Sequence, residues 1–148
     1  MKNNKGFTLV EMLVVVAIIG ILASVFLIGL RGFRGAAYDA RRLSDLQKVQ
    51  GYLELYYNKN RAYPNASTWA ELETALTDSA TGAGVNAIPN DPLATQTYQY
   101  APDSSDFQSY VLGATLSDEY AGALSESHEL DGTVLGVDCD DPVYCVQF

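Results

Sequence analysis

Residues 7–30 read FTLVEMLVVVAIIGILASVFLIGL, and this stretch decides how the rest of the chain is organised. Its first charged residue is Glu11, and nineteen uncharged residues follow, from Met12 to Leu30. As a helix these residues would rise about 28 Å, close to the roughly 30 Å hydrocarbon core of a bilayer. A helix that is apolar on every face has no partner surface in water. We therefore expect residues 7–34 to lie in a membrane or in the core of an assembly.

The helical pattern continues beyond the apolar stretch. Opposite charges stand at helical spacing, as at Asp39 and Arg42, and no proline occurs before Pro64. We predict one helix from Phe7 to about Asn58, apolar all round at first and amphipathic afterwards. Its later apolar residues recur every three or four positions, the spacing of one helical face, at Ala36, Ala40, Leu43, Leu46, Val49, Leu53 and Tyr56.

The remainder of the chain predicts the rest of an α+β fold. Thr68 and Glu71 have the spacing of a capping box, so we expect a short helix there with Trp69, Leu72 and Leu76 on one face. An antiparallel sheet should pack on the amphipathic half of the long helix, with residues 35–148 forming one globular domain. The strand-like runs are Tyr98–Tyr100, Tyr110–Leu116, Thr133–Val137 and Val143–Phe148.

Charge is distributed unevenly along the chain. All nine Lys and Arg residues lie at or before Arg61, whereas residues 62–148 contain fourteen Asp and Glu residues and no Lys or Arg. Such an acidic surface repels phosphate and disfavours direct binding of nucleic acid. The carboxylates form either a solvated outer face or a site for a divalent cation. No cofactor is required, but calcium is possible, although the spacing is not that of an EF-hand loop; its candidate ligands are Asp131, Asp138, Asp140 and Asp141.

Cys139 and Cys145 are the only cysteines in the chain. Outside the cytoplasm they would form a disulfide, and its short ring contributes about 2 kcal/mol in the loop-entropy model. A zinc site is the alternative, but it needs further ligands and His128 is the only histidine. That histidine belongs to no nucleophile motif, so the sequence predicts no enzymatic activity.

Glu11 is the most informative residue, because a carboxylate inside an apolar helix usually marks function. The run Lys5-Gly6-Phe7-Thr8-Leu9-Val10-Glu11 and the apolar residues after it resemble the prepilin signature of type IV pilins and type II secretion pseudopilins. The resemblance implies that a membrane prepilin peptidase removes residues 1–6 by cutting between Gly6 and Phe7, and that Phe7 is N-methylated. It also implies that Glu11 pairs with the Phe7 amine of a neighbouring subunit, which would offset the desolvation of both charges. The alternative for Glu11 is an acid tolerated at the membrane interface.

The likeness extends past the signature. Residues 56–64 (YYNKNRAYP) and 88–92 (IPNDP) are similar to the major pseudopilins. That group has Asp-Pro-Trp-Gly where this chain has Asp91-Pro92-Leu93-Ala94, and it lacks a cysteine pair near the C-terminus. The resemblance therefore favours a structural subunit of a type IV pilus-like homopolymer with a pilin-like fold. The alternative is a major pseudopilin of a type II secretion system. A plain membrane-anchored binding protein would explain neither Gly6 nor Glu11.

The resemblance also implies a sequence of locations. The precursor would cross the lipid bilayer once and meet the prepilin peptidase and an assembly machinery there. It would then enter a cell-surface pilus or a periplasmic pseudopilus, with residues 35–148 outside the cytoplasm. Basic residues flank both ends of the apolar stretch, and counting them alone would place that domain inside. The cysteine pair favours the outside.

Overall fold

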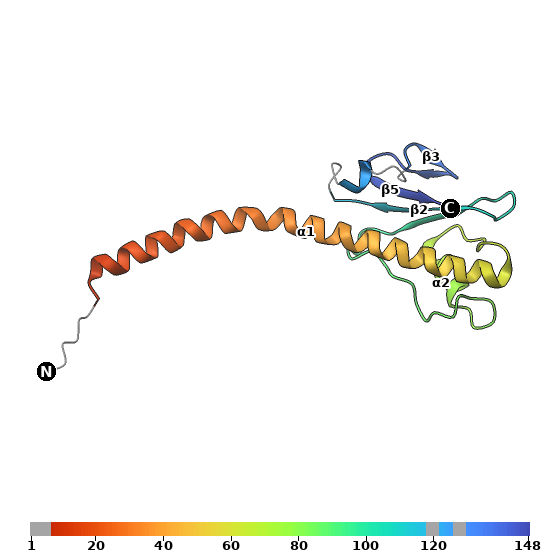
Figure 1. Ribbon diagram of the computed structural model, residues 1–148, viewed down its shortest axis with the longest axis horizontal. Coiled ribbons are helices and arrows are strands. Elements are labelled where there is room, and N and C mark those ends of the chain that lie inside the picture. Colours follow the sequence, from red (N-terminus) through yellow and green to blue (C-terminus); the bar gives the residue numbers. More distant parts are fainter. Residues whose placement is uncertain (1–6, 118–121, 126–129) are drawn as a thin grey trace. The chain divides into compact units, whose positions relative to one another are not determined.

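The computed structural model describes residues 7–117, 122–125 and 130–148, without the side chains of residues 25–33 and of Ser125. The chain divides into two compact units, Met1–Gly35 and Ala36–Phe148. The elements, labelled in Figure 1, are α1 (Leu9–Asn60), α2 (Trp69–Thr77), β1 (Gln99–Pro102), β2 (Tyr110–Thr115), η1 (Gly122–Ser125), β3 (Thr133–Val134), β4 (Val137–Asp138) and β5 (Val143–Gln147).

Helix α1 confirms the predicted long helix, with each end two residues later than expected. It ends because Arg61 adopts a positive φ of 61°, the conformation that commonly closes a helix. The Arg61 N–H still donates to the Tyr57 carbonyl at 2.7 Å, and the Asn60 side-chain amide donates to the Tyr56 carbonyl at 2.9 Å. These two bonds satisfy carbonyls that the helix end would otherwise leave without partners.

Among the described residues, no helix combines the length and the apolar character that crossing a membrane requires.

Helix α2 begins at a cap formed by Thr68, as the sequence predicts. Thr68 has extended backbone angles, and its hydroxyl oxygen accepts from the Glu71 N–H at 3.2 Å. The Glu71 carboxylate accepts from the Ser67 N–H at 2.8 Å, one residue earlier than in a standard capping box. Trp69, Leu72 and Leu76 are buried, which confirms the predicted apolar face.

The predicted antiparallel sheet is present as three strands in the order β1-β2-β5. Tyr100 of β1 stands opposite Leu112 of β2, and Leu112 stands opposite Val146 of β5. The Tyr110 and Phe148 main chains exchange hydrogen bonds at 3.1 and 3.2 Å and extend the pairing by one position. The chain is thus an α+β protein in which a long N-terminal helix accompanies a small antiparallel sheet.

One strand prediction is wrong. Residues 133–137 form two short strands, β3 and β4, that pair with each other as a hairpin instead of one continuous strand. Leu135 and Gly136 reverse the chain between them with φ angles of 50° and 87°. Two successive positive φ values are the geometry of the tight turn that matches strand twist. Leucine rarely adopts this conformation, so residue type alone gave little sign of the turn.

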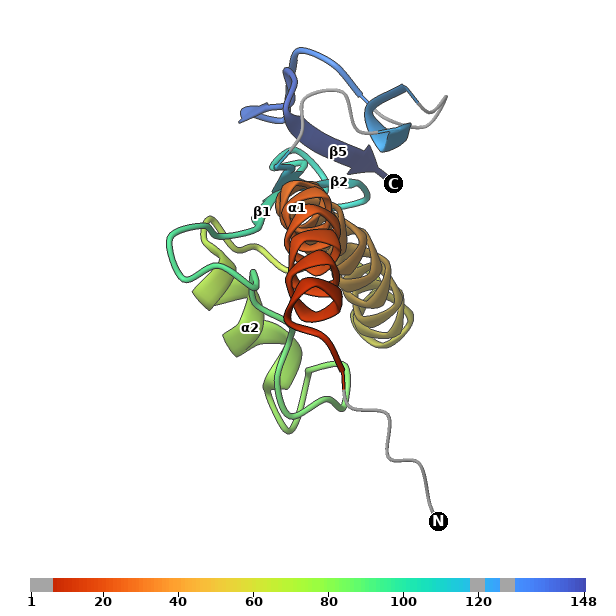
Figure 2. The same ribbon diagram turned by 90° about the vertical axis from the view of Figure 1, so that its left-hand side faces the viewer.

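Within residues 36–148, α2 and the sheet lie on different sides of the second half of α1, and η1 and the β3–β4 hairpin lie beyond the sheet (Figures 1 and 2). Leu46, Val49 and Leu53 of α1 are buried in one cluster with residues of α2, β1 and β2. This cluster confirms that the amphipathic half of the long helix is the partner of the sheet. A second cluster joins Val111 to Val137 and both cysteines under the hairpin.

Candidate assembly and processing site

The start of α1 is held by reciprocal hydrogen bonds between Thr8 and Glu11. The Thr8 hydroxyl oxygen accepts from the Glu11 N–H at 3.2 Å. In return, Glu11 Oε2 accepts from the Thr8 N–H at 2.8 Å and from the Thr8 hydroxyl at 2.7 Å. This is a capping box in which Thr8 is the N-cap and Glu11 stands three residues later. A carboxylate in the first helical turn also interacts favourably with the helix dipole.

The capping box gives Glu11 a local role that our reading of the sequence missed. The signal for it in the sequence is a threonine followed three residues later by a glutamate. Among the described residues, only Oε2 of the carboxylate accepts a hydrogen bond, and Glu11 takes part in no ion pair. One carboxylate oxygen therefore remains available to a second group.

The first turns of α1 expose apolar side chains in every direction. Phe7 is 78% exposed, Leu13 is 62% exposed and Ile21 is 66% exposed. A helix interior to a soluble domain would bury at least one such face. Large exposed apolar surfaces mark contacts with lipid or with other protein chains. The exposed set comprises Phe7, Leu9, Val10, Met12, Leu13, Val14, Val15, Val16, Ile18, Ile19, Ile21 and Leu22.

The predicted cleavage junction is only partly described. Gly6 lies outside the described residues, whereas Phe7 is the residue at which the description starts. Cleavage between Gly6 and Phe7, methylation of Phe7 and pairing of Glu11 with another subunit all stay predictions.

A buried ion network in residues 36–148 is the feature that the sequence least revealed. Arg42 is fully buried, and all five of its N–H groups have acceptors. Its guanidinium donates to Asp91 Oδ2 at 2.7 Å and to Asp91 Oδ1 at 3.1 Å. Further bonds run to Asp39 at 2.8 Å, to Gln96 at 2.7 Å and to Ser117 at 3.0 Å.

The Arg42 network shifts the pKa values of Asp91 and Arg42. Burial raises the pKa of Asp91, but the Arg42 hydrogen bonds, the Leu93 N–H and the Arg42 charge outweigh it and hold that pKa below its ordinary value of 3.8. Hydrogen bonding to Asp91 raises the pKa of Arg42 in turn. The Asp39 carboxylate also accepts from the Ser117 N–H at 2.9 Å. The network thus ties α1 to two distant segments of the chain.

The Asp39 and Arg42 pair was visible as a helical charge pair, but the position of Asp91 was not. Arg42 is 49 residues from Asp91, and no periodicity links positions so far apart. A second buried acid of α1, Asp45, accepts from the Tyr98 hydroxyl at 3.1 Å. Burial, followed by the Asp45 charge, raises the pKa of Tyr98. These contacts position the globular unit rather than perform chemistry.

The predicted disulfide is present between Cys139 and Cys145, and both residues are buried. It joins the segment after β4 to the middle of β5. Val111 and Val137 pack against it, and a Cβ added at Gly113 would stand 3.4 Å from Cys145 Sγ. The bond therefore holds the β3–β4 hairpin against the outer face of the sheet.

The structure does not bring the four predicted calcium ligands together. Asp131, Asp138, Asp140 and Asp141 are all exposed. Asp140 accepts from the Gly132 N–H at 3.0 Å, and Asp138 accepts from the Asp140 N–H at 3.2 Å, so these two side chains bind backbone groups. In the described part of the chain, no group of three or more His, Cys, Asp or Glu residues is placed to hold a metal ion. Calcium binding stays a prediction, and His128 of the zinc alternative lies outside the described residues.

The start of the chain matches a known protein family. The family profile of the prokaryotic N-terminal methylation motif matches residues 1–27, which contain Gly6, Phe7 and Glu11. No solved structure matches the chain significantly.

Curated proteins match over much more of the chain. The type II secretion system core protein G of Vibrio cholerae is 32% identical over 122 residues, which cover 77% of this chain and 83% of that protein. Its counterpart in Klebsiella pneumoniae is 28% identical over 109 residues, covering 69% and 78%. The type IV wide pilus major component PilA4 of Thermus thermophilus is 41% identical over 63 residues, covering 43% and 48%.

Proposed function

The chain belongs to the family of type IV pilins and type II secretion pseudopilins, and we propose that it is a structural subunit of a type IV pilus-like helical filament. The observation that carries this proposal is the start of α1, where apolar side chains are exposed on every side and Glu11 is the one carboxylate among them. In a filament, the same segment of neighbouring copies would cover this surface.

Processing would precede assembly. A prepilin peptidase would cut between Gly6 and Phe7, and methylation of the new amine would follow. Before assembly the apolar segment would hold the chain in the bilayer, where the assembly machinery takes it up. The second carboxylate oxygen of Glu11 is available to the Phe7 amine of the next subunit. That amine exists only after cleavage, so this pairing requires processing to come first. Burying an unpaired carboxylate or an unpaired ammonium costs desolvation free energy. Pairing the two groups offsets both costs.

A major pseudopilin that drives protein export is the second candidate. The names of the Vibrio and Klebsiella relatives favour it. The Cys139–Cys145 disulfide and the absence of Trp-Gly after Pro92 favour the pilus, as does the similarity to the Thermus pilus component. Both candidates share the helix, the processing and the assembly contact, and they differ in the destination of the filament.

Electron microscopy with gold-labelled antibodies against residues 36–148 tests the proposal. Cells that express the chain should carry long labelled surface fibres, and cells without prepilin peptidase should carry none. Labelled material confined to the periplasm, together with loss of protein export when the chain is deleted, would instead establish the pseudopilin. Labelled protein that stays dispersed in the membrane would contradict both.

A further inference from the structure

Residues 36–148 carry far more negative than positive charge. They contain seventeen Asp and Glu residues against five Lys and Arg residues, a net charge of −12. Copies of such a unit repel one another wherever carboxylate faces carboxylate. If the chain polymerises as proposed above, on which this inference rests, the contact between globular units must bring the few cations of one copy to the carboxylates of the next.

Three of the exposed cations, Arg41, Lys48 and Lys59, form a stripe along one side of α1. Arg41 and Lys59 are eighteen residues apart, about five helical turns, and Lys48 falls between them on nearly the same side. The Arg41 side chain is 61% exposed and that of Lys48 is 54% exposed. Leu55 lies on this side and is 53% exposed, and nothing stands within 4 Å of a Cβ added at Gly51. This face of α1, the cationic stripe, is open to a partner.

The bonds that the three cations make within their own chain use only some of their hydrogen-bond donors. Lys48 donates to Asp45 at 2.9 Å, and Arg41 is 3.6 Å from the same carboxylate. Asp45 is buried, but both cations are more than half exposed, and a lysine ammonium has three donors, so the bond to Asp45 leaves donors of Lys48 to spare. Lys59 donates to the Gly82 carbonyl at a long 3.3 Å. The three cations can therefore bind a second partner while their bonds within the chain stay in place.

The complementary surface lies beyond the sheet. Asp131, Asp138, Asp140 and Asp141 are exposed around the disulfide, which fixes the backbone that carries them. Within the described residues, ion pairs involve only Asp39, Asp45 and Asp91, so none of these four carboxylates has a cationic partner. We call this set the disulfide-loop acids.

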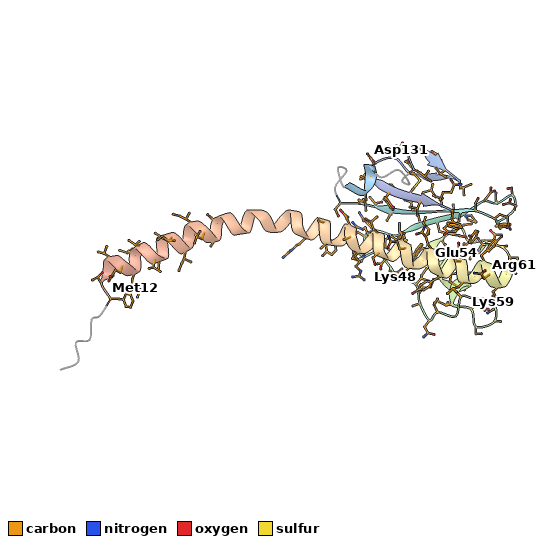
Figure 3. All side chains as sticks on the ribbon, viewed as in Figure 1. Met12, Lys48, Glu54, Lys59, Arg61 and Asp131 are labelled. Carbon is orange, nitrogen blue, oxygen red and sulfur yellow. A yellow bond between two sulfur atoms is a disulfide. The ribbon has the colours of Figure 1, made fainter. Side chains whose placement is uncertain are left out.

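The two surfaces face opposite ways. Figure 3 shows Asp131 beyond the sheet, on the other side from Lys48 and Lys59 of α1, so one copy cannot pair its own stripe with its own acids. Two copies can pair them only head to tail. A head-to-tail contact leaves one unused surface at each end, so it adds further copies, in a ring or in an open helical assembly, instead of closing as a dimer, and the filament proposed above needs the open form.

We propose that the cationic stripe of each subunit, centred on Lys48, binds the disulfide-loop acids of a neighbouring copy of the chain. The partner is a second copy because it presents unpaired carboxylates on a rigid loop and no cation of its own in that part of the sequence. The contact is separate from the pairing at Glu11, and it fixes how the globular units follow one another along the filament.

Chemical coupling in assembled filaments tests the pairing directly. Filaments are formed from an equal mixture of ¹⁴N- and ¹⁵N-labelled full-length chain and treated with a water-soluble carbodiimide, which joins a lysine amine to a nearby carboxylate as an amide. Digestion and mass spectrometry should show Lys48 or Lys59 joined to the peptide containing Asp138–Asp141, with half of the products carrying one label of each kind. Coupling of these lysines only within one chain, or only to other carboxylates, would overturn the proposal.

Charge exchange supplies the second test. Lys59→Glu, which leaves the Lys48–Asp45 pair in place, and Asp140→Lys should each lower filament yield about tenfold because like charges then face each other, and the double variant should recover most of the yield. Asp106→Lys makes the same change of charge on another exposed acid and should leave the yield unchanged. Equal losses in Asp106→Lys, or no recovery in the double variant, would contradict the pairing. Failure of the unaltered chain to form filaments would overturn the proposed function, and this inference with it.

Discussion

The guanidinium of Arg42 and the carboxylate of Asp91 meet through two parallel hydrogen bonds of 2.7 and 3.1 Å, although 49 residues separate them in the chain. Both side chains are almost completely buried. Paired N–H groups on a planar cation match the two oxygens of a carboxylate, and lysine cannot reproduce this geometry. The pair fixes the loop before β1 against α1 and so sets where the sheet sits on the helix.

Arg42→Ala should destabilise the protein strongly. Removing one partner of a buried ion pair leaves an uncompensated charge, which costs about 3–5 kcal/mol of unfolding free energy. Arg41→Ala is the matched control, because the Arg41 side chain is 61% exposed, its 3.6 Å contact with Asp45 contributes about 0–1 kcal/mol, and Asp45 keeps its bond to Lys48. Urea unfolding of the full-length protein in detergent measures both. Similar losses in the two variants would mean that the buried network contributes nothing particular to stability.

The same pair predicts how stability changes in acid. The pKa of Asp91 is lower in the folded protein than its ordinary value of 3.8. The network therefore makes its full contribution to the free energy of unfolding above pH 3.8. This contribution is lost as the pH falls through the lower pKa of Asp91 in the folded protein. Asp91→Asn should be less stable than the unaltered protein at neutral pH and should lose less further stability between about pH 4 and pH 2. Thermal unfolding across this range measures the slopes, and parallel slopes would contradict the assignment.

Most of the fold could be predicted from patterns that act over short distances. The spacing of Leu46, Val49 and Leu53 predicted the buried face of α1, and Thr68 with Glu71 predicted the start of α2. The β3–β4 hairpin was missed because Leu135 occupies a turn conformation that glycine or asparagine usually marks.

In the candidate site, too, features that depend on neighbouring residues could be predicted and those that depend on tertiary structure could not. The prepilin signature is local, so the match of residues 1–27 to the methylation motif could be predicted from the sequence alone, whereas the roles of Gly6, Phe7 and Glu11 stay predictions. The burial of Arg42 depends on residues brought together by tertiary structure, and a helical charge pair looks the same whether it is buried or exposed. Calcium binding by the four candidate carboxylates stays a prediction, and in the described part of the chain they do not form a group placed to hold a metal ion.

Breaking the disulfide should loosen the outer layer of the domain more than its core. Cys139→Ala with Cys145→Ala should lower the unfolding free energy by about 2 kcal/mol, because the closed ring is short. Hydrogen exchange should accelerate in β3, β4 and β5, while the amides of Leu46 and Leu53 in α1 keep their protection. Equal acceleration in α1 would show that the disulfide holds the whole domain rather than the hairpin.

Glu11→Ala should leave the chain in the membrane fraction and processed, yet reduce its assembly. The apolar stretch and the Gly6–Phe7 junction are unchanged in this variant, and only the carboxylate is lost. Thr8→Ala is the control, because it removes the capping hydroxyl and keeps the charge. Filament yield should fall much further in Glu11→Ala than in Thr8→Ala. Equal losses would assign the role of Glu11 to the capping box alone.

The most direct test of the filament assignment is the mass of the N-terminal peptide of this chain in filaments sheared from cells and collected by centrifugation. We predict that the chain is abundant in this fraction and that its first peptide begins at Phe7 and carries one methyl group on the amine. Sheared filaments that lack the chain, or that contain it with residues 1–6 still attached, would contradict the account.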